Sequence, residues 1–292
     1  GTSFSNNYGN LVPSVTLSRN LKPGQTVKVS YSRRIQRPSL WYLNPYVDQA
    51  DSLNIRFGNP ELKPELSNAY ELGWSTFFKS SSLNASLYWR STSDVIESVS
   101  TIEGAVTSTT FRNVSSSNAI GLNLFGSTQI NPKWSVSGSV NLYDYRIKSN
   151  VDNQYSNESF MYNINMNSNL SFGEGFSASV FGMFNSPRTT LQGRSSSWSM
   201  LSVGLKKELF EKKGSIGLNV NNPYKKHQEF KQDLTGVNFS QSSVFGFEFR
   251  SVSLNFSYRF GKVDFKQQRR SRGGIRNDDQ KQGDSNQMGG GM

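Results

Sequence analysis

Apolar and polar residues alternate along much of this chain, and almost nothing recurs at helical spacing. Between positions 162 and 172, apolar side chains occupy most even positions, and asparagine or serine occupies the odd ones. The segment 251–260 repeats the pattern, with Val252, Leu254 and Phe256 separated by serine and asparagine. A period of two places successive side chains on opposite faces of a β-strand. The pattern therefore predicts many strands, each with one apolar and one small polar face.

The predicted strands are joined by connections that alternate between short and long. The short connections are 22–25, 79–82, 131–133, 173–175 and 211–214, and the long ones are 37–65, 98–110, 149–157, 187–196 and 221–245. This sorting is typical of an outer-membrane β-barrel, which has tight periplasmic turns and extended extracellular loops. Strands of about 10 to 14 residues are also long enough to cross a membrane when tilted.

The composition agrees with a barrel although the chain is polar on average. Only 34% of the residues are apolar, the mean hydropathy is −0.57, and 13% are aromatic. A helical span needs about 18 consecutive apolar residues, whereas only every second residue of a barrel strand meets lipid. Aromatic residues near strand ends, among them Tyr70, Phe78, Trp134 and Tyr143, predict girdles at the two membrane interfaces. Aromatic residues also favour strands in general.

Charge and residue chemistry argue against an enzyme, a metal site and nucleic-acid binding. The net charge is +11, but the basic residues are scattered and no recognition helix is visible. There is no cysteine, which excludes disulfides and cysteine-bound metals. The single histidine, His227, lies in a charged loop without a partner for nucleophilic catalysis or metal binding. We therefore expect no cofactor and no catalytic residue.

The direction of the strands predicts that this sequence is part of a longer protein. If the chain ends in the periplasm after Phe260, counting back gives about eleven strands. The first, at 11–19, then also runs towards the periplasm. An odd number leaves two edges unpaired in lipid, where each bare backbone group costs several kcal/mol. We expect the remaining strands upstream, with a barrel portion at 1–262 and a disordered, polar periplasmic tail at 263–292.

One block of sequence resembles a known family. Residues 33–65 read RRIQRPSLWYLNPYVDQADSLNIRFGNPELKPE, and YEL follows at 70–72. This block is similar to the barrel signature of TonB-dependent receptors of the Bacteroidetes type. The closing strand that ends on Phe260, followed by Gly261 and Lys262, also resembles the end of that family.

The resemblance implies a fold and a function for the intact protein. It implies an antiparallel, up-and-down barrel of about 22 strands, of which this chain is the second half. It also implies an N-terminal plug and energy supplied by a TonB-type protein of the inner membrane. Neither a plug nor an energy-coupling segment is recognisable in these 292 residues. The expected function is energised uptake of a siderophore, a glycan or a peptide across the outer membrane.

Candidate ligand-binding residues lie in the first long loop. Trp41, Tyr42 and Tyr46 are expected either to stack on a sugar or siderophore or to pack the loop itself. Arg37, together with Arg33 and Arg34, has two expected roles. These arginines either draw anionic ligands to the pore, or they bind lipopolysaccharide phosphates or loop carboxylates.

The rest of the signature is expected to shape the loop base. Pro fixes φ, and Gly and Asn tolerate conformations that other residues avoid. The residues assigned this structural role are Arg33, Arg34, Pro38, Asn44, Pro45, Gly58, Asn59, Pro60, Pro64 and Glu65.

The last strand resembles an assembly signal. Phe256, Tyr258 and Phe260 follow the alternating aromatic pattern that the barrel-assembly machinery reads, although they also fit an ordinary lipid-facing strand. Expected partners are therefore outer-membrane lipid, lipopolysaccharide, the assembly machinery and a TonB-type protein, but not nucleic acid.

The sequence pattern is also compatible with two other classes of protein. One is a self-contained adhesin or assembly barrel of about 10 or 12 strands without active transport. The other is a soluble, sugar-binding β-sandwich or β-solenoid, which would bury the apolar residues in a dry core.

Overall fold

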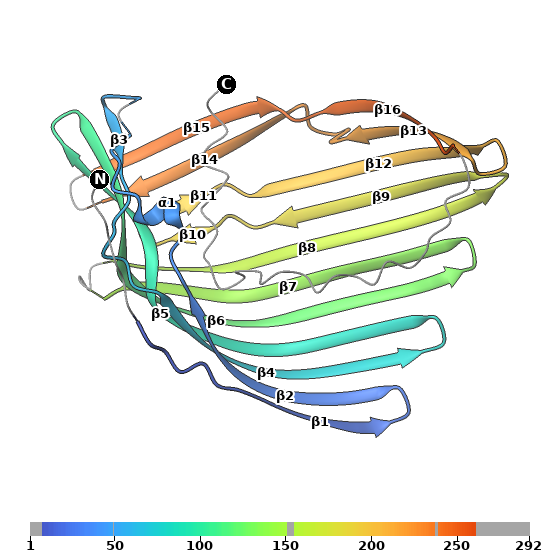
Figure 1. Ribbon diagram of the computed structural model, residues 1–292, viewed down its shortest axis with the longest axis horizontal. Helices are drawn as coiled ribbons and strands as arrows, with labels where there is room; N and C mark the ends of the chain where they lie inside the picture. Colours follow the sequence, from blue (N-terminus) through green and yellow to red (C-terminus); the bar gives the residue numbers. More distant parts are fainter. Residues whose placement is uncertain (1–7, 49, 151–154, 237–238, 261–292) are drawn as a thin grey trace.

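The computed structural model describes residues 8–48, 50–150, 155–236 and 239–260, and most of them lie in one curved antiparallel sheet (Figure 1). Eleven strands follow one another along the sheet: β1 (Ser14–Lys22), β2 (Gln25–Gln36), β4 (Glu65–Phe78), β5 (Ser81–Glu103), β6 (Val106–Asn131), β7 (Trp134–Ser149), β8 (Ser156–Gly173), β9 (Phe176–Asn185), β12 (Trp198–Leu209), β13 (Gly214–Asn221) and β16 (Ser251–Tyr258). The predicted up-and-down sheet of about eleven strands is confirmed.

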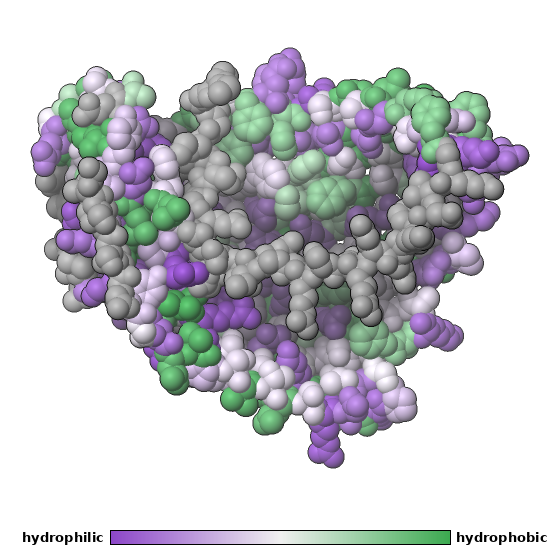
Figure 2. All heavy atoms as spheres, in the orientation of Figure 1, coloured by the Kyte–Doolittle hydropathy of each residue, from purple (hydrophilic) through white to green (hydrophobic). Residues whose placement is uncertain are grey.

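The sheet is open. β1 and β16 form its two edges, and no pairing joins them in the described part of the chain. The sheet curves around a hollow, which the space-filling view shows on its concave side (Figure 2). This arrangement is part of a barrel wall rather than a closed barrel.

The register between strands collects the apolar residues on one face. One row of directly paired residues runs across seven strands: Leu17, Val29, Leu72, Leu87, Leu122, Leu142 and Tyr162. The next row, on the other face, is Ser18, Lys28, Gly73, Ser86, Asn123, Asn141, Asn163 and Asn185. The sheet therefore has an apolar face and a polar face over its whole width, as the alternation predicts.

The apolar face is not covered by protein. Leu87 is 57% exposed on this face, and Leu254 in β16 is 70% exposed. A soluble sandwich would bury such residues against a second sheet. The soluble alternative is therefore wrong, and the uncovered apolar face is the lipid-facing surface of a membrane barrel.

Polar and aromatic residues mark the limits of the apolar band. On β7 the lipid-facing side chains are uncharged from Trp134 until Asp144. Ten residues at about 3.4 Å each, tilted by about 40°, span about 26 Å along the barrel axis, which matches the height of a barrel's apolar band. At the end of the band away from the short turns, Tyr70 stacks on Trp89 with ring centroids 5.2 Å apart. Tyr143, also expected in a girdle, instead lies on the polar face, because Leu142 and Asp144 occupy the lipid-facing positions around it.

All long connections lie at one end of the strands, and they contain structure that the sequence pattern did not predict. They form α1 (Leu40–Leu43), β3 (Asn54–Arg56), β10 (Thr189–Thr190), β11 (Gly193–Ser195), β14 (His227–Thr235) and β15 (Ser240–Glu248). The expected loop at 98–110 is wrong, since β5 and β6 continue through it as a hairpin that turns near Gly104. Both faces of that hairpin are largely polar, so it lacks the alternation that reveals a strand. The first strand is also displaced, to Ser14–Lys22 from the expected 11–19.

Buried side chains are few and gather near these connections. One cluster contains Tyr42, Leu62 and Ile96, and the other contains Val95, Ile147 and Leu191. Among the described residues, no helix is long and apolar enough to cross a membrane.

Candidate functional site

The rim is the group of elements at the long-connection end of the sheet: the segment 37–64, the upper part of the β5–β6 hairpin, and the sheet β10-β11-β14-β15 (Figure 1). It is where the predicted ligand-binding residues lie. The short turns, at the opposite end of the strands, offer little surface, so the rim is the candidate site for ligand capture.

Helix α1 is fixed in the rim by its N-cap and by Tyr42. The Ser39 hydroxyl accepts a hydrogen bond from the Tyr42 amide at 3.3 Å, which begins the short helix. Tyr42 is 3% exposed, and its ring centroid lies 4.2 Å from that of Phe111 on β6. This burial favours a packing role for Tyr42 over ligand stacking, the two possibilities that the sequence left open.

The Gly58–Pro60 turn is hydrogen-bonded to the backbone at the end of α1, at Tyr42 and Asn44. The Gly58 amide donates to the Asn44 carbonyl at 2.8 Å, and the Asn59 amide donates to the Tyr42 carbonyl at 2.7 Å. The Asn59 side chain reaches further and donates to the Phe111 carbonyl at 3.0 Å. A Cβ on residue 58 would lie 2.5 Å from the Asn44 carbonyl oxygen. The glycine is needed for this close backbone approach.

A second set of contacts ties the end of the loop to β5 and β6. Asn113 accepts from the Lys63 amide at 2.8 Å and donates to the Lys63 and Asp94 carbonyls at 2.9 and 2.7 Å. The buried carboxylate of Glu65 accepts from the Ile96 amide at 2.7 Å. The signature residues and β5–β6 therefore form one packed unit. Asn113 carries no local sequence signal, because its partners are 19 and 50 residues away.

Two predicted ligand residues remain accessible on this unit. Trp41 is 47% exposed and Tyr46 is 74% exposed. Arg37 is partly buried and Pro38 is buried where the chain leaves β2. The structure thus brings Trp41 and Tyr46 to the surface while the intervening Tyr42 is buried.

The other structural residues of the signature lie at the same end of the sheet. Arg33 and Arg34 are paired with Asn68 and Ser67 on β4 and project from opposite faces of β2. The remaining members follow the same loop, with Asn44 and Pro45 exposed, Pro60 partly buried and Pro64 buried.

The β10–β11 hairpin folds back over the polar face of the sheet. Leu191 packs with Val95 on β5 and Ile147 on β7, and its amide donates to the Glu97 carboxylate at 3.2 Å. The Gln192 side chain accepts from the Ser100 amide at 2.9 Å and donates to the Ser100 carbonyl at 3.3 Å. A segment that follows β9 is thereby anchored to β5, four strands away. No local pattern in the sequence marks Leu191, Gln192 or Glu97 for this role.

The β14–β15 hairpin extends the rim beyond β11. Phe230 and Phe247 stack with ring centroids 5.7 Å apart. Lys226 pairs with Glu248 at 3.0 Å, and this hydrogen-bonded lysine lowers the pKa of the Glu248 carboxyl. His227 pairs in register with Glu248 at the start of the hairpin. The described residues contain no group of three or more histidine, cysteine or acidic side chains able to hold a metal ion.

Below the rim, the polar face carries a ladder of hydrogen-bonded side chains. The Tyr88 hydroxyl on β5 reaches across β6 and donates to the Asn141 side chain at 3.0 Å. Asn141 donates to Asn163 at 3.5 Å, and Asn163 donates to Asn185 at 2.8 Å. The Tyr88–Asn141 contact spans the intervening strand β6, which is easiest where side chains converge on the concave side of a curved sheet. The polar face therefore lines the lumen.

The predicted assembly signal lies at the short-turn end of the edge strand. Phe256 is on the lipid-facing side of β16, and Phe260 is 83% exposed just beyond that strand. The Tyr258 ring lies 4.7 Å from the Phe260 ring and 5.6 Å from the Phe210 ring. The expected tail at 263–292 lies outside the described residues.

Solved structures similar to this chain include a copper transporter and receptors for ferric siderophores. The copper transporter OprC matches with a TM-score of 0.61 and 15% identity, over 85% of this chain and 40% of OprC. The receptor FyuA of Yersinia pestis, for ferric yersiniabactin uptake, matches with a TM-score of 0.57 and 16% identity, over 86% of this chain and 37% of FyuA. A mutant of the ferric enterobactin receptor PfeA of Pseudomonas aeruginosa matches with a TM-score of 0.55 and 17% identity, over 86% of this chain and 40% of PfeA.

These likenesses show the fold alone, and the chain spans about 40% of the length of the first of these structures. No curated protein is similar enough to the chain to count as a match. The sequence of residues 1–258 matches the outer membrane protein beta-barrel family. With that match and the open, two-faced membrane sheet, the chain belongs to the outer membrane protein β-barrel family and resides in the outer membrane.

Proposed function

We propose that this chain forms about half of the barrel of a TonB-dependent receptor, which captures a ligand at the rim and takes it up across the outer membrane. The observation that carries the proposal is the combination of a polar lumen wall with a rim that is packed into a defined surface above it. A barrel that served only as a membrane anchor would not need loops anchored across four strands.

The open sheet supports a larger barrel. β1 pairs only with β2 and β16 only with β13, so the outer edge of each strand has no partner strand within the described chain. Unpaired backbone groups in lipid cost several kcal/mol each, so both edges require strands from elsewhere in the intact protein. A self-contained adhesin or assembly barrel would instead pair β1 with β16, and this argues against that alternative.

The proposed capture surface is the exposed part of the segment 37–64. Trp41 and Tyr46 offer aromatic faces for stacking on a sugar or a siderophore, and Arg37 adds positive charge nearby. Tyr42 is buried beneath this surface and packs against Phe111. The three solved relatives are named for copper, ferric yersiniabactin and ferric enterobactin. For this chain we propose a siderophore, a glycan or a peptide.

The proposed partners follow from the family resemblance and from the position of each surface. A TonB-type protein supplies energy through an N-terminal part of the intact protein. Lipopolysaccharide and lipid contact the apolar face, and the assembly machinery reads Phe256, Tyr258 and Phe260.

Uptake measurements in cells test the function. Uptake of labelled ferric siderophores, copper, oligosaccharides and peptides would be compared in the wild type, in a strain that lacks the intact protein, and in a strain that lacks the TonB-type protein. We expect uptake of one ligand class to be lost in both deletion strains. Loss in neither strain would contradict the proposal and favour a barrel without active transport.

Substitutions at the rim then test the capture surface. We expect Trp41→Ala combined with Tyr46→Ala to weaken binding of that ligand by about tenfold, since each lost stacking contact contributes about 0.5–1.5 kcal/mol. Leu40→Ala is the matched control, because Leu40 is 77% exposed on the same helix but has no ring. Equal affinities for all three proteins would place the ligand elsewhere.

A further inference from the structure

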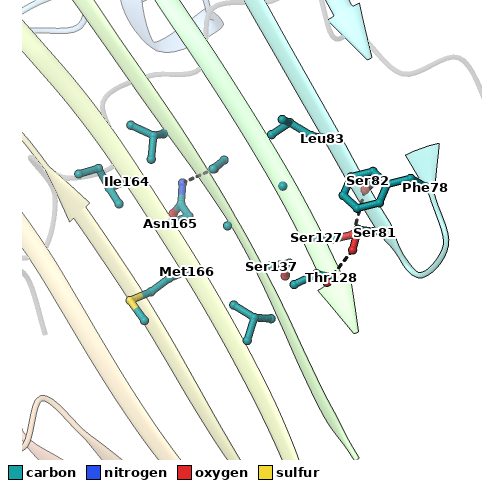
Figure 3. A pocket seen from close by; sticks show the side chains of 15 residues that line it. Phe78, Ser81, Ser82, Leu83, Ser127, Thr128, Ser137, Ile164, Asn165 and Met166 are labelled. Carbon is teal, nitrogen blue, oxygen red and sulfur yellow. Dashed lines mark hydrogen bonds between the residues drawn. The ribbon is translucent and has the colours of Figure 1, made fainter. Parts of the chain in front are cut away.

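The lipid-facing surface contains a groove where two glycines lie opposite each other. Gly126 on β6 pairs directly with Gly138 on β7, and both lie in the apolar face. Larger apolar side chains flank them: Leu83, Val136, Val140, Ile164 and Met166. Together they line an open groove of about 580 Å³ (Figure 3). This volume is within the range of about 300–1,000 Å³ that is typical of small-molecule sites.

The groove becomes polar towards the short-turn end of the sheet. The hydroxyls of Ser81 and Thr128 lie 2.7 Å apart there, and these residues pair in register on the apolar face (Figure 3). Beyond them, the β4–β5 and β6–β7 turns carry the exposed lysines Lys79 and Lys133. Neither turn, 79–80 or 132–133, contains a carboxylate. Apolar walls, hydroxyls and positive charge therefore follow one another along a single direction.

We propose that this groove holds one phospholipid of the periplasmic leaflet. The acyl chain lies between Leu83 and Met166 above the two glycines, the ester oxygens accept from Ser81 or Thr128, and the phosphate lies near Lys79 and Lys133. The order of apolar, hydroxyl and cationic groups matches the order of tail, ester and phosphate in a phospholipid.

The surroundings of the groove favour this occupant over others. The groove is continuous with the lipid-facing surface, so acyl chains are the medium in contact with it. Because apolar association in lipid lacks a hydrophobic driving force, a particular lipid is retained through close packing and polar contacts. Cationic residues near the membrane surface add attraction for an anionic headgroup. The groove provides both, with its apolar walls and glycines for packing and its hydroxyls for polar contacts.

The test is lipid retention by the intact protein that contains this chain. The protein would be purified in detergent, mixed with palmitoyl-oleoyl phosphatidylglycerol, and examined by native mass spectrometry. Gly126→Leu fills the groove, and an added Cβ there meets only Leu83 and Ser82 atoms at 3.8 Å. Ala178→Leu adds similar bulk to the same face of β9 and is the control. We expect Gly126→Leu to lose one retained lipid and Ala178→Leu to keep it.

The lysines give a second, independent readout. Lys79→Gln and Lys133→Gln should each lower retention of phosphatidylglycerol by about fivefold. Equal lipid retention in the wild type and in Gly126→Leu would overturn the proposal. A changed oligomeric state of Gly126→Leu with unchanged lipid retention would also overturn it, because it would indicate that a second copy of the protein occupies the groove. If Gly126→Leu fails to fold, a variant that combines Lys79→Gln with Lys133→Gln decides. Unchanged retention in that variant overturns the proposal.

Discussion

At the residue scale, small differences in position separate supporting residues from accessible ones. Trp41 and Tyr42 are neighbours in sequence, yet one is half exposed and the other is buried against Phe111. The signature predicted a rigid loop base, but composition alone gave no means to assign the two aromatic residues different roles. Gly58 lies at the centre of this base, where it allows two backbone segments to approach.

Replacement of Gly58 tests that close approach. In Gly58→Ala, the new methyl group would meet the Asn44 and Tyr42 carbonyl oxygens at 2.5 and 2.6 Å. We expect the segment 40–64 to lose about 1–3 kcal/mol of local stability, as is typical of overpacked sites. Hydrogen exchange of its amides would measure the change. Gly246→Ala is the control, because a Cβ at that rim position meets atoms only at 3.6 Å. Unchanged exchange in Gly58→Ala would show that the backbone shifts at no cost.

At the element scale, the alternation along each strand determined which side chains meet lipid and which meet the lumen. β8 is the clearest example, since Ile164 pairs with Val140 on the apolar face while Asn163 pairs with Asn141 on the polar one. The β5–β6 hairpin shows where this signal ends. Both faces of the hairpin become polar above the membrane, and the sequence pattern therefore predicted a loop there.

A pair of arginine substitutions on β8 tests the two faces. Ile164→Arg places a charge in lipid and should cost about 2–4 kcal/mol near the middle of the bilayer. Asn167→Arg places the same side chain on the lumen side and should cost much less. Guanidinium unfolding in liposomes would measure both free energies of unfolding. A larger loss for Asn167→Arg would reverse the assignment of the faces.

The end of β16 belongs to the same scale, because its aromatic residues act through assembly rather than through packing. Phe260 is largely exposed, so Phe260→Ala should leave the stability of the purified barrel nearly unchanged. We expect a lower amount of heat-modifiable, folded protein in the outer membrane, while the variant refolds in detergent like the wild type. Val252→Ala, at the other end of the strand, is the control. Equal amounts of all three in the membrane would leave Phe260 with no role in assembly.

At the scale of the whole molecule, the open sheet sets what this chain needs. Its two edges, β1 and β16, must find partner strands, and its small rim clusters hold the loops rather than a central core. Stability therefore depends on closure of the barrel in lipid.

Engineered cysteines test how the barrel closes, and these 292 residues contain no native cysteine. Leu218→Cys with Leu254→Cys joins paired residues of β13 and β16. Their Cα atoms are expected about 4.5–5.5 Å apart, within disulfide range, so this control pair should cross-link in the intact protein. Leu17→Cys with Leu254→Cys joins the two edges and should not cross-link. A disulfide between the edges would mean that the chain closes on itself.

The sequence by itself determined the membrane sheet: its alternation, its two faces, the number of its strands and the position of its short turns. These features could be predicted because a period of two is a local property of each strand, and lipid demands the same rule from every strand. Only the tertiary structure decided the rim. Glu97, Asn113 and Gln192 hold it together through partners 94, 50 and 92 residues away, and polar contacts over such separations leave no periodic trace in the chain.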